Sequence, residues 1–153
     1  MCGIAVVGAT LSFSRTNEPE SSIGFPKDYR KWVHIKSTLL GEDHPNVRYR
    51  GYNHIYANDL AFKGYETGYF PEGSTIVLDV VAATAADKAL VEGKHALIDI
   101  MVKDSVRFAS TGGWQFAEFD GNGVPIQLSA EQVLTCYRCH QRPNDRVFCD
   151  FRK

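Results

Sequence analysis

Two cysteines three positions apart, with a histidine directly after the second, constrain this chain more than any other feature. They are Cys136, Cys139 and His140, in the order Cys-Tyr-Arg-Cys-His. Side chains three positions apart on a helix lie on the same face. Two thiols so placed can form thioethers with the two vinyl groups on one edge of a porphyrin, and the adjacent imidazole can ligate its iron. The pattern predicts one covalently attached haem c, bound by Cys136 and Cys139, with His140 as the proximal iron ligand.

Two other chemistries also use a C-x-x-C pair. A structural zinc site needs a second pair of ligands, for which the chain offers only Cys2, Cys149 and scattered histidines. A thioredoxin-like redox pair opens a helix after a strand near the N-terminus, whereas this pair closes a helix near the C-terminus. Haem is favoured over both because the five-residue pattern is specific. Cys149 is expected to be a small buried side chain rather than a ligand.

A second iron ligand is hard to find in the sequence. Met101 lies within a strand candidate, where core packing is the usual role of methionine. The remaining histidines are expected on the surface or satisfied within the core; they are His34, His44, His54 and His95. We therefore expect an open axial position on the iron. An open position lets small molecules bind, whereas a fully ligated haem mainly transfers electrons.

Composition limits the remaining classes of protein. The 153 residues, of 17.1 kDa, are enough for one domain with a real core. Seventeen Lys and Arg against eighteen Asp and Glu give a net charge of −1, which argues against a general nucleic-acid binder. No apolar run approaches eighteen residues, so no transmembrane helix is expected.

The N-terminal stretch has two interpretations. Residues 2–13 are an apolar run whose length suits the hydrophobic region of a secretory signal, although no Lys or Arg precedes it. The alternative is a buried N-terminal strand. Residues 14–24 are rich in Ser, Pro, Glu and Gly and read as a polar linker. We expect residues 1–24 to be a truncated signal segment plus linker, residues 25–153 to be the folded domain, and the protein to be exported, for instance to the periplasm.

Local patterns predict an α+β fold, an antiparallel β-sheet with a few short helices. Asn58 is suited to cap a short helix through residues 60–62. Ser129 and Gln132 form a capping-box pattern that opens a helix running into the cysteines. The other expected elements are a short helix over residues 25–32, strands over 50–56, 75–81 and 96–102, a weaker strand over 114–119, and turns over 41–46 and 70–73.

Several stretches, taken in order, resemble the cytochrome P460 family, which includes the cytochromes c′-beta. They are FPKDYRKW at residues 25–32, TGYFPEG at 67–73, VKDSVRF at 102–108, GWQF at 113–116, and the C-x-x-C-H motif followed by Val147 and Phe148. The resemblance covers about residues 25–152. It implies a β-rich fold with the haem packed against the sheet, and a homodimer.

The catalytic branch of that family implies two further site residues. A lysine beside the haem is cross-linked to the porphyrin in that branch, where hydroxylamine is oxidised. The matching positions here hold Tyr65 and Glu66, and Lys63 is the nearby lysine. A pocket carboxylate of the family matches Asp99, one methylene shorter than the expected glutamate. Such a carboxylate can accept protons from a bound N–H or O–H donor if burial raises its pKa.

Aromatic and basic residues complete the expected site. An apolar wall on the distal side would favour uncharged diatomic molecules, because a buried anion needs compensating donors. Candidates for this wall are Phe62, Tyr65, Phe70, Phe116 and Phe119. Arg142 and Arg146 are candidate partners for the haem propionates, or else part of a solvated C-terminal end.

Three functions are consistent with these features. The favoured one is an exported mono-haem c-type cytochrome with an open distal position that binds or redox-processes a small nitrogen species, nitric oxide or hydroxylamine, and exchanges electrons with a partner protein. The second is a hydroxylamine-oxidising enzyme with Lys63 cross-linked and Asp99 as proton acceptor. The third is a simple electron-transfer cytochrome with a sixth ligand.

Overall fold

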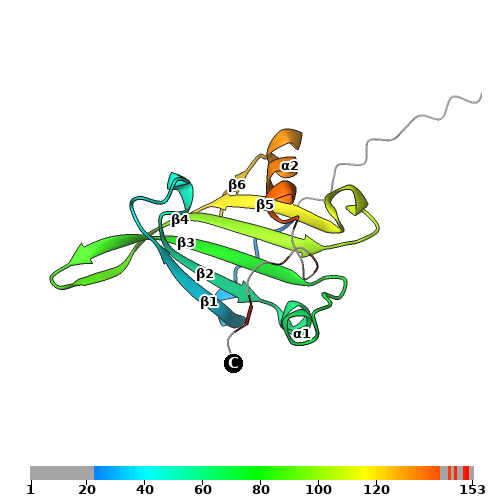
Figure 1. The fold of residues 1–153 in the computed structure, drawn as a ribbon, viewed down its shortest axis with the longest axis horizontal. Coiled ribbons are helices and arrows are strands. Elements are labelled where there is room, and N and C mark those ends of the chain that lie inside the picture. The colour runs from blue at the N-terminus through cyan, green and yellow to red at the C-terminus, as the bar shows by residue number, and fades with distance from the viewer. Residues whose placement is uncertain (1–22, 142–144, 146, 148–149, 152–153) are drawn as a thin grey trace, which may run out of the picture.

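A six-stranded antiparallel sheet, with its strands side by side in chain order, forms the framework of the protein (Figure 1). The computed structural model describes residues 23–141, 145, 147, 150 and 151. The strands are β1 (Val33–Leu40), β2 (Gly51–Ala57), β3 (Thr75–Ala86), β4 (Ala89–Lys103), β5 (Trp114–Asp120) and β6 (Pro125–Ile126). The helices are α1 (Asp59–Thr67) and α2 (Ala130–Cys139), with 3-10 turns η1 (Tyr29–Lys31), η2 (Val47–Tyr49) and η3 (Ala109–Thr111). The predicted α+β class is confirmed.

Both predicted helix caps are present. The Asn58 side chain accepts a hydrogen bond from the Ala61 backbone N–H at 2.8 Å, which starts α1. The helix continues to Thr67 and ends at Gly68, whose φ of 80° is the left-handed conformation that favours glycine at a helix end. No helix in the described part of the chain is long and apolar enough to cross a membrane.

The first strand was not predicted. Residues 25–32 were expected to form a short helix, but only the single 3-10 turn η1 forms there. Val33 and Ile35 lie in β1, because β-branched side chains suit a pleated strand packed on one face. Strand β1 pairs antiparallel with β2 and forms an edge of the sheet.

Strands β3 and β4 are much longer than predicted. Strand β3 continues past residue 81, and β4 begins before residue 96. Together they form a hairpin that extends away from the rest of the molecule (Figure 1). Its side chains are mostly exposed. The prediction stopped short because residues 82–95 lack the apolar alternation of a strand with one buried face.

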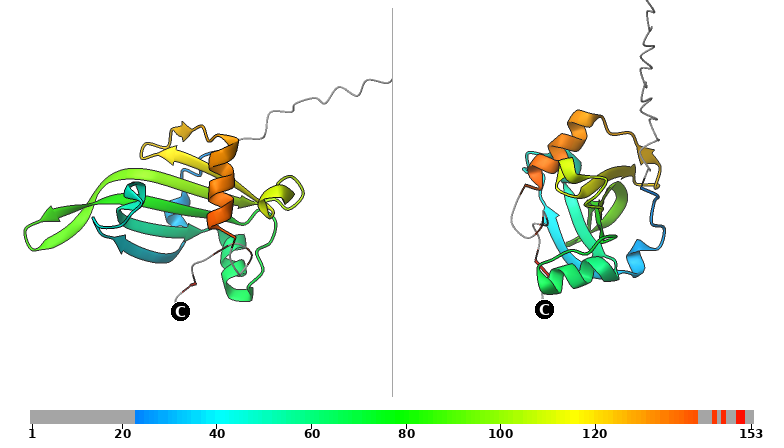
Figure 2. Two further views of the ribbon diagram at one scale, coloured as in Figure 1. Left: turned by 45° about the horizontal axis from the view of Figure 1, so that its top comes forward. Right: turned by 90° about the vertical axis from the view of Figure 1, so that its right-hand side faces the viewer.

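Each face of the sheet carries its own apolar cluster. The first face holds Ile35, Ala57, Ala61, Phe70, Ile76, Met101, Trp114 and Val147. The second face holds Tyr29, Val77, Ile98, Ile100 and Phe119. Val147 and Phe151 pack against the first face, and Phe25 and Tyr29 pack against the second. Helix α2 and turn η1 accordingly lie on opposite sides of the sheet (Figure 2). Of the expected signal segment and linker, residues 1–24, the first 22 residues lie outside the described part of the chain.

Asp79 ties the N-terminal segment to the second face. Its side chain is 0% exposed and accepts hydrogen bonds from the Tyr29 hydroxyl and Arg30 Nη2, each at 2.7 Å. His95 Nδ1 lies 2.9 Å from its other oxygen. Burial alone would raise the pKa of Asp79, but the bonds from Tyr29, Arg30 and His95 outweigh burial and lower it.

Candidate haem site

Helix α2 presents the C-x-x-C-H motif. The predicted capping box starts the helix: the Ser129 hydroxyl accepts from the Gln132 N–H at 3.2 Å, and the Gln132 side chain accepts from the Ser129 N–H at 2.8 Å. His140 is the C-cap, and its backbone N–H donates to the Cys136 carbonyl at 3.0 Å. Cys136 and Cys139 therefore lie in the last turn, and neither forms a disulfide. Because the Ser129 cap sets where α2 begins, it also determines that both thiols lie in the last turn of this helix.

No residue of α2 is buried, although the helix carries apolar side chains. Cys136 is half-buried and Cys139 is exposed. A helix normally buries an apolar stripe against its neighbours, so α2 keeps contact area available for a bound group next to the described residues. Two thiols one turn apart, an imidazole and an uncovered helix face together fit a covalently attached porphyrin.

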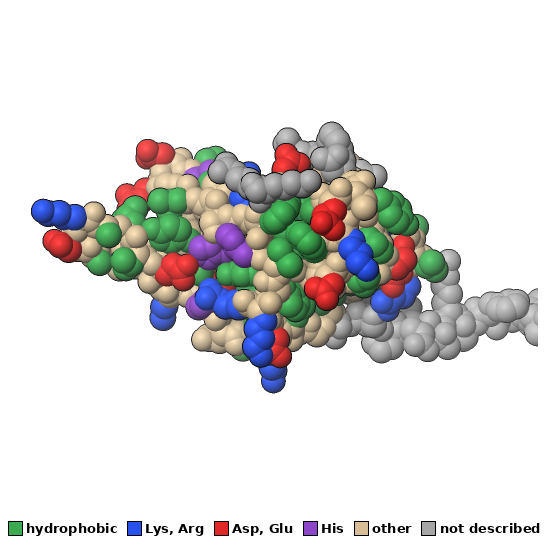
Figure 3. Space-filling view, turned by 90° about the horizontal axis from the view of Figure 1, so that it is seen from below, with side chains coloured by type: hydrophobic (Ala, Val, Ile, Leu, Met, Phe, Trp, Pro, Cys, Tyr) green, Lys and Arg blue, Asp and Glu red, His purple; other side chains and the backbone are tan. Residues whose placement is uncertain are grey.

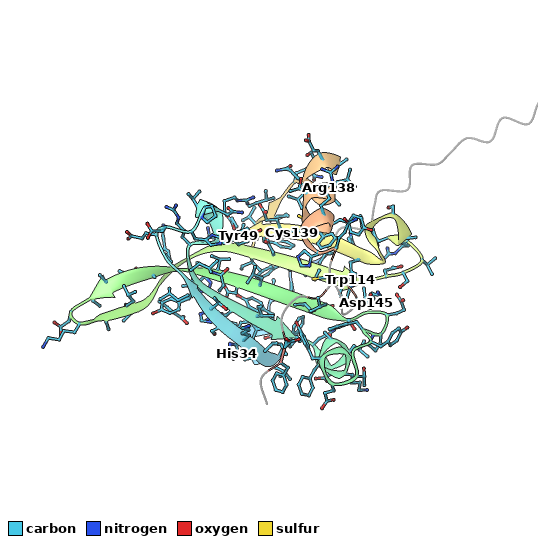
Figure 4. The ribbon with its side chains drawn as sticks, viewed as in Figure 1. His34, Tyr49, Trp114, Arg138, Cys139 and Asp145 are labelled. Atoms are coloured by element: carbon cyan, nitrogen blue, oxygen red, sulfur yellow. The ribbon has the colours of Figure 1, made fainter. Side chains whose placement is uncertain are left out.

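The His140 ring is directed to the first face of the sheet. Its centroid lies 5.3 Å from that of Phe116, a residue of β5. Tyr49 and Cys139 lie over the same part of the sheet, whereas Trp114 and Asp145 lie together further along it (Figure 4). The imidazole thus lies between the end of α2 and the sheet, where it could ligate the iron of a bound haem.

Two carboxylates lie next to the first cysteine. Asp99 of β4 and Glu118 of β5 are direct cross-strand neighbours. The Tyr49 hydroxyl donates to Asp99 Oδ2 at 2.7 Å, and Arg48 forms an ion pair with Glu118. Burial, followed by the charges of Asp99 and Glu118, raises the pKa of the Cys136 thiol, which places all three groups in one neighbourhood.

Asp99 is the predicted pocket carboxylate, and its pKa is shifted as a buried acid requires. Burial raises the pKa of Asp99 to about 6, the charge of Glu118 adds to this rise, and the bond from Tyr49 and the charge of Arg48 offset part of it. The carboxyl therefore changes charge close to neutral pH, as a group that exchanges protons with a ligand would need to.

Lys63 lies away from these residues. It is exposed on α1, whose Phe62 and Tyr65 pack instead against the first-face cluster. The structure brings Asp99, Cys136, Cys139 and His140 together but does not bring Lys63 to them.

A different lysine is buried on the first face. Lys103 is 7% exposed, and its Nζ lies 2.6 Å from Asp145 Oδ1 and 5.1 Å from the centroid of the Trp114 ring. Sequence reasoning gave Lys103 no role beyond the family pattern. Its partner, Asp145, is 42 positions away in the sequence, so the pair becomes visible only in the folded chain.

Four of the five expected aromatic residues lie on one face. Phe62, Tyr65, Phe70 and Phe116 belong to the first-face cluster. Phe119 lies on the opposite face with Val77 and Ile98, because neighbours along a strand alternate between faces, and so it is not part of this wall. Arg142, Arg146 and Cys149 lie outside the described residues.

The other ligand candidates have structural roles. Met101 is 7% exposed within the first-face core. His34 and His54 both lie at hydrogen-bond distance from Ser37 Oγ, at 2.8 and 2.7 Å. Histidine side chains lie close together beside the hairpin on the face of the molecule shown in Figure 3. His95 contacts Asp79, and His44 contacts the Asn46 carbonyl. Within the described residues, no three His, Cys, Asp or Glu side chains are arranged to hold a metal ion.

The fold and the C-x-x-C-H helix fit a haem-binding cytochrome. The family model of cytochrome P460 matches residues 26–149, most of the chain, and the chain therefore belongs to the cytochrome P460 family. No curated protein is similar enough to count as a match.

Proposed function

We propose that this protein is a mono-haem c-type cytochrome that binds or redox-processes nitric oxide or hydroxylamine at an open iron position and exchanges electrons with a partner protein. Cys136 and Cys139 form the thioethers, and His140 is the proximal ligand. The observation that carries the proposal is that α2 presents these three side chains with no buried residue of its own, next to Asp99. Bound haem supplies an iron centre for ligand binding and electron exchange.

The described residues support an open position. Met101 packs in the core, and His34, His54 and His95 are engaged with other side chains. The half-buried carboxyl of Asp99 can hold or accept a proton from a protic nitrogen compound such as hydroxylamine. Phe116 contributes apolar surface, which favours uncharged ligands.

An optical spectrum of the haem-loaded protein tests this function. We expect a high-spin c-type spectrum that changes when nitric oxide is added. A low-spin spectrum indifferent to nitric oxide would contradict the proposal and favour the simple electron-transfer cytochrome.

The hydroxylamine-oxidising alternative has its own test. A red-shifted ferrous Soret band that disappears in Lys63→Ala, but persists in the exposed hairpin variant Lys88→Ala, would establish the cross-linked enzyme. The raised pKa of Asp99 favours this alternative, and the exposed position of Lys63 counts against it.

We also propose export and self-association. The haem c motif and the apolar residues 2–13 support export, since both are typical of exported cytochromes. The hairpin supports a homodimer, because Leu90 and Val91 remain 51% and 42% exposed on a projecting strand. Fractionation of the native host cells tests export. Light scattering of the unmodified protein and of Leu90→Ser tests the homodimer, and a monomeric mass for both proteins would contradict it.

A further inference from the structure

Tyr49 has no role in the function proposed above, yet it is fixed firmly over Asp99. It ends the 3-10 turn η2, which is capped by Asn46, whose side chain accepts from the Arg48 N–H at 3.2 Å. The Asn53 side chain donates to the Tyr49 carbonyl at 2.7 Å. The backbone around Tyr49 is therefore anchored from two directions, and its hydroxyl reaches Asp99 Oδ2 at 2.7 Å.

The groups around Asp99 come from four elements. Turn η2 supplies Tyr49 and Arg48, β5 supplies Glu118, and α2 supplies Cys136. The cross-strand neighbour from β3 is Leu78, which carries no charge. Arg48 and Glu118 neutralise one another, so the described charged groups that act on Asp99 sum with it to zero when it is protonated and to −1 when it is ionised.

We propose that Tyr49 is a positioning residue that fixes the Asp99 carboxyl beside the haem motif, so that the ionisation of this carboxyl decides whether an anionic ligand can enter. The inference rests on the proposed function, because it assumes that ligands approach the haem past Asp99. It names the ligand class of the site: uncharged molecules bind with the same affinity at any pH, and anions bind more tightly when Asp99 is protonated than when it is ionised.

The physical reason is repulsion in a partly desolvated site. Like charges a few ångströms apart in protein surroundings weaken binding by roughly tenfold or more. A neutral ligand experiences no such charge repulsion. Tyr49 matters because its hydrogen bond stabilises the ionised form of Asp99 and so sets the pH at which the site closes to anions.

The direct test follows the carboxyl itself. Infrared difference spectra of the haem-loaded protein, with isotope-labelled aspartate, report the protonated carboxyl of Asp99 across pH, and Asp99→Asn identifies its band. Tyr49→Phe should move the midpoint upward by about one pH unit, because the ionised form loses a charged hydrogen bond. Glu118→Gln should move it downward, because a neighbouring negative charge is removed.

Tyr52→Phe is the matched control. The Tyr52 hydroxyl also makes one bond, to the Leu90 carbonyl at 2.7 Å, but its ring stacks on His54 away from Asp99. The midpoint of the Asp99 carboxyl in Tyr52→Phe should equal that in the unmodified protein. An unchanged midpoint in Tyr49→Phe overturns the positioning role, and a shift in Glu118→Gln shows that the measurement responds to the groups around Asp99.

Ligand titrations then separate the inference from the function. Azide affinity, read from the haem spectrum, should fall as pH rises through the Asp99 midpoint, and nitric oxide affinity should not. Asp99→Asn should remove the fall, and Tyr49→Phe should shift it upward. If azide affinity falls with pH in Asp99→Asn as it does in the unmodified protein, the gate is overturned. Nitric oxide binding in the same experiment would still uphold the proposed function. Failure of both ligands to bind overturns the function and the gate together, and the infrared midpoints still decide the role of Tyr49.

Discussion

Lys103 and Asp145 form an ion pair that joins strand β4 to the chain shortly after the haem motif, with Nζ 2.6 Å from Oδ1. The Trp114 indole N–H donates to the Asp145 carbonyl at 2.9 Å, and Lys103 lies over the same indole ring. Asp145 adopts a left-handed backbone conformation with φ of 52°. The C-terminal side of the motif is thereby held to the sheet, opposite the end held by the Ser129 cap.

Removing Lys103 should loosen this attachment. Lys103→Met preserves the volume of the side chain but leaves the Asp145 carboxylate without its cation, which should cost about 1–3 kcal/mol of unfolding free energy. Urea unfolding of the haem-loaded protein measures it. Lys94→Met, an exposed lysine on the hairpin, is the control, and equal stability of the two variants would show that the pair contributes nothing.

The two thiols should each carry one covalent bond to the haem. Cys136→Ser and Cys139→Ser should each retain a single thioether, and the double variant should release its pigment into acid-acetone. Cys149→Ser, which alters a cysteine outside the motif, should retain both bonds. Pyridine haemochrome spectra distinguish none, one and two thioethers. Retention of pigment by the double variant would refute covalent attachment through this motif.

The raised pKa of Asp99 should make the protein less stable as pH rises. Its folded-state pKa of about 6 lies above the ordinary value of 3.8, so ionisation opposes folding. Stability from this group is complete below about pH 4 and declines as pH rises through 6, by roughly 2–3 kcal/mol. Asp99→Asn should remove this decline in urea unfolding at pH 4 and pH 8. A parallel decline in the variant would contradict the assignment.

Asp79 should behave in the opposite way. Its pKa is lowered, so the stability it contributes is present above its ordinary pKa of 3.8 and is lost as pH falls through the folded-state value. Asp79→Asn should cost about 2–4 kcal/mol at pH 7, because the buried Tyr29 hydroxyl and Arg30 lose a charged partner.

The control for Asp79 is an exposed ion pair. Asp28→Asn breaks the contact with Lys31, in which both side chains are largely exposed, and should leave stability unchanged. The difference between Asp79→Asn and the unmodified protein should shrink in acid. A difference that persists unchanged at pH 3 would show that the effect comes from packing rather than charge.

Local patterns predicted the parts of this fold that depend on few residues. Asn58 and Ser129 act as helix caps because a cap needs only a side-chain oxygen and the next few backbone N–H groups. A local pattern does not predict the strand that contains Val33 and Ile35, because β1 is stabilised by pairing with β2, which is distant in the sequence. The long hairpin was missed for a similar reason: its two exposed strands are stabilised by pairing with each other rather than by a buried face.

The sequence by itself determined the prediction of covalent haem attachment, because the spacing of two thiols and an imidazole within five residues is a local property of the chain. Only the tertiary structure decided what surrounds that motif. Tyr49 and Asp99 are 50 positions apart, and Lys103 and Asp145 are 42 apart. Strand register and segment docking bring such groups together, and both depend on packing energies summed over the whole sheet rather than on any local pattern.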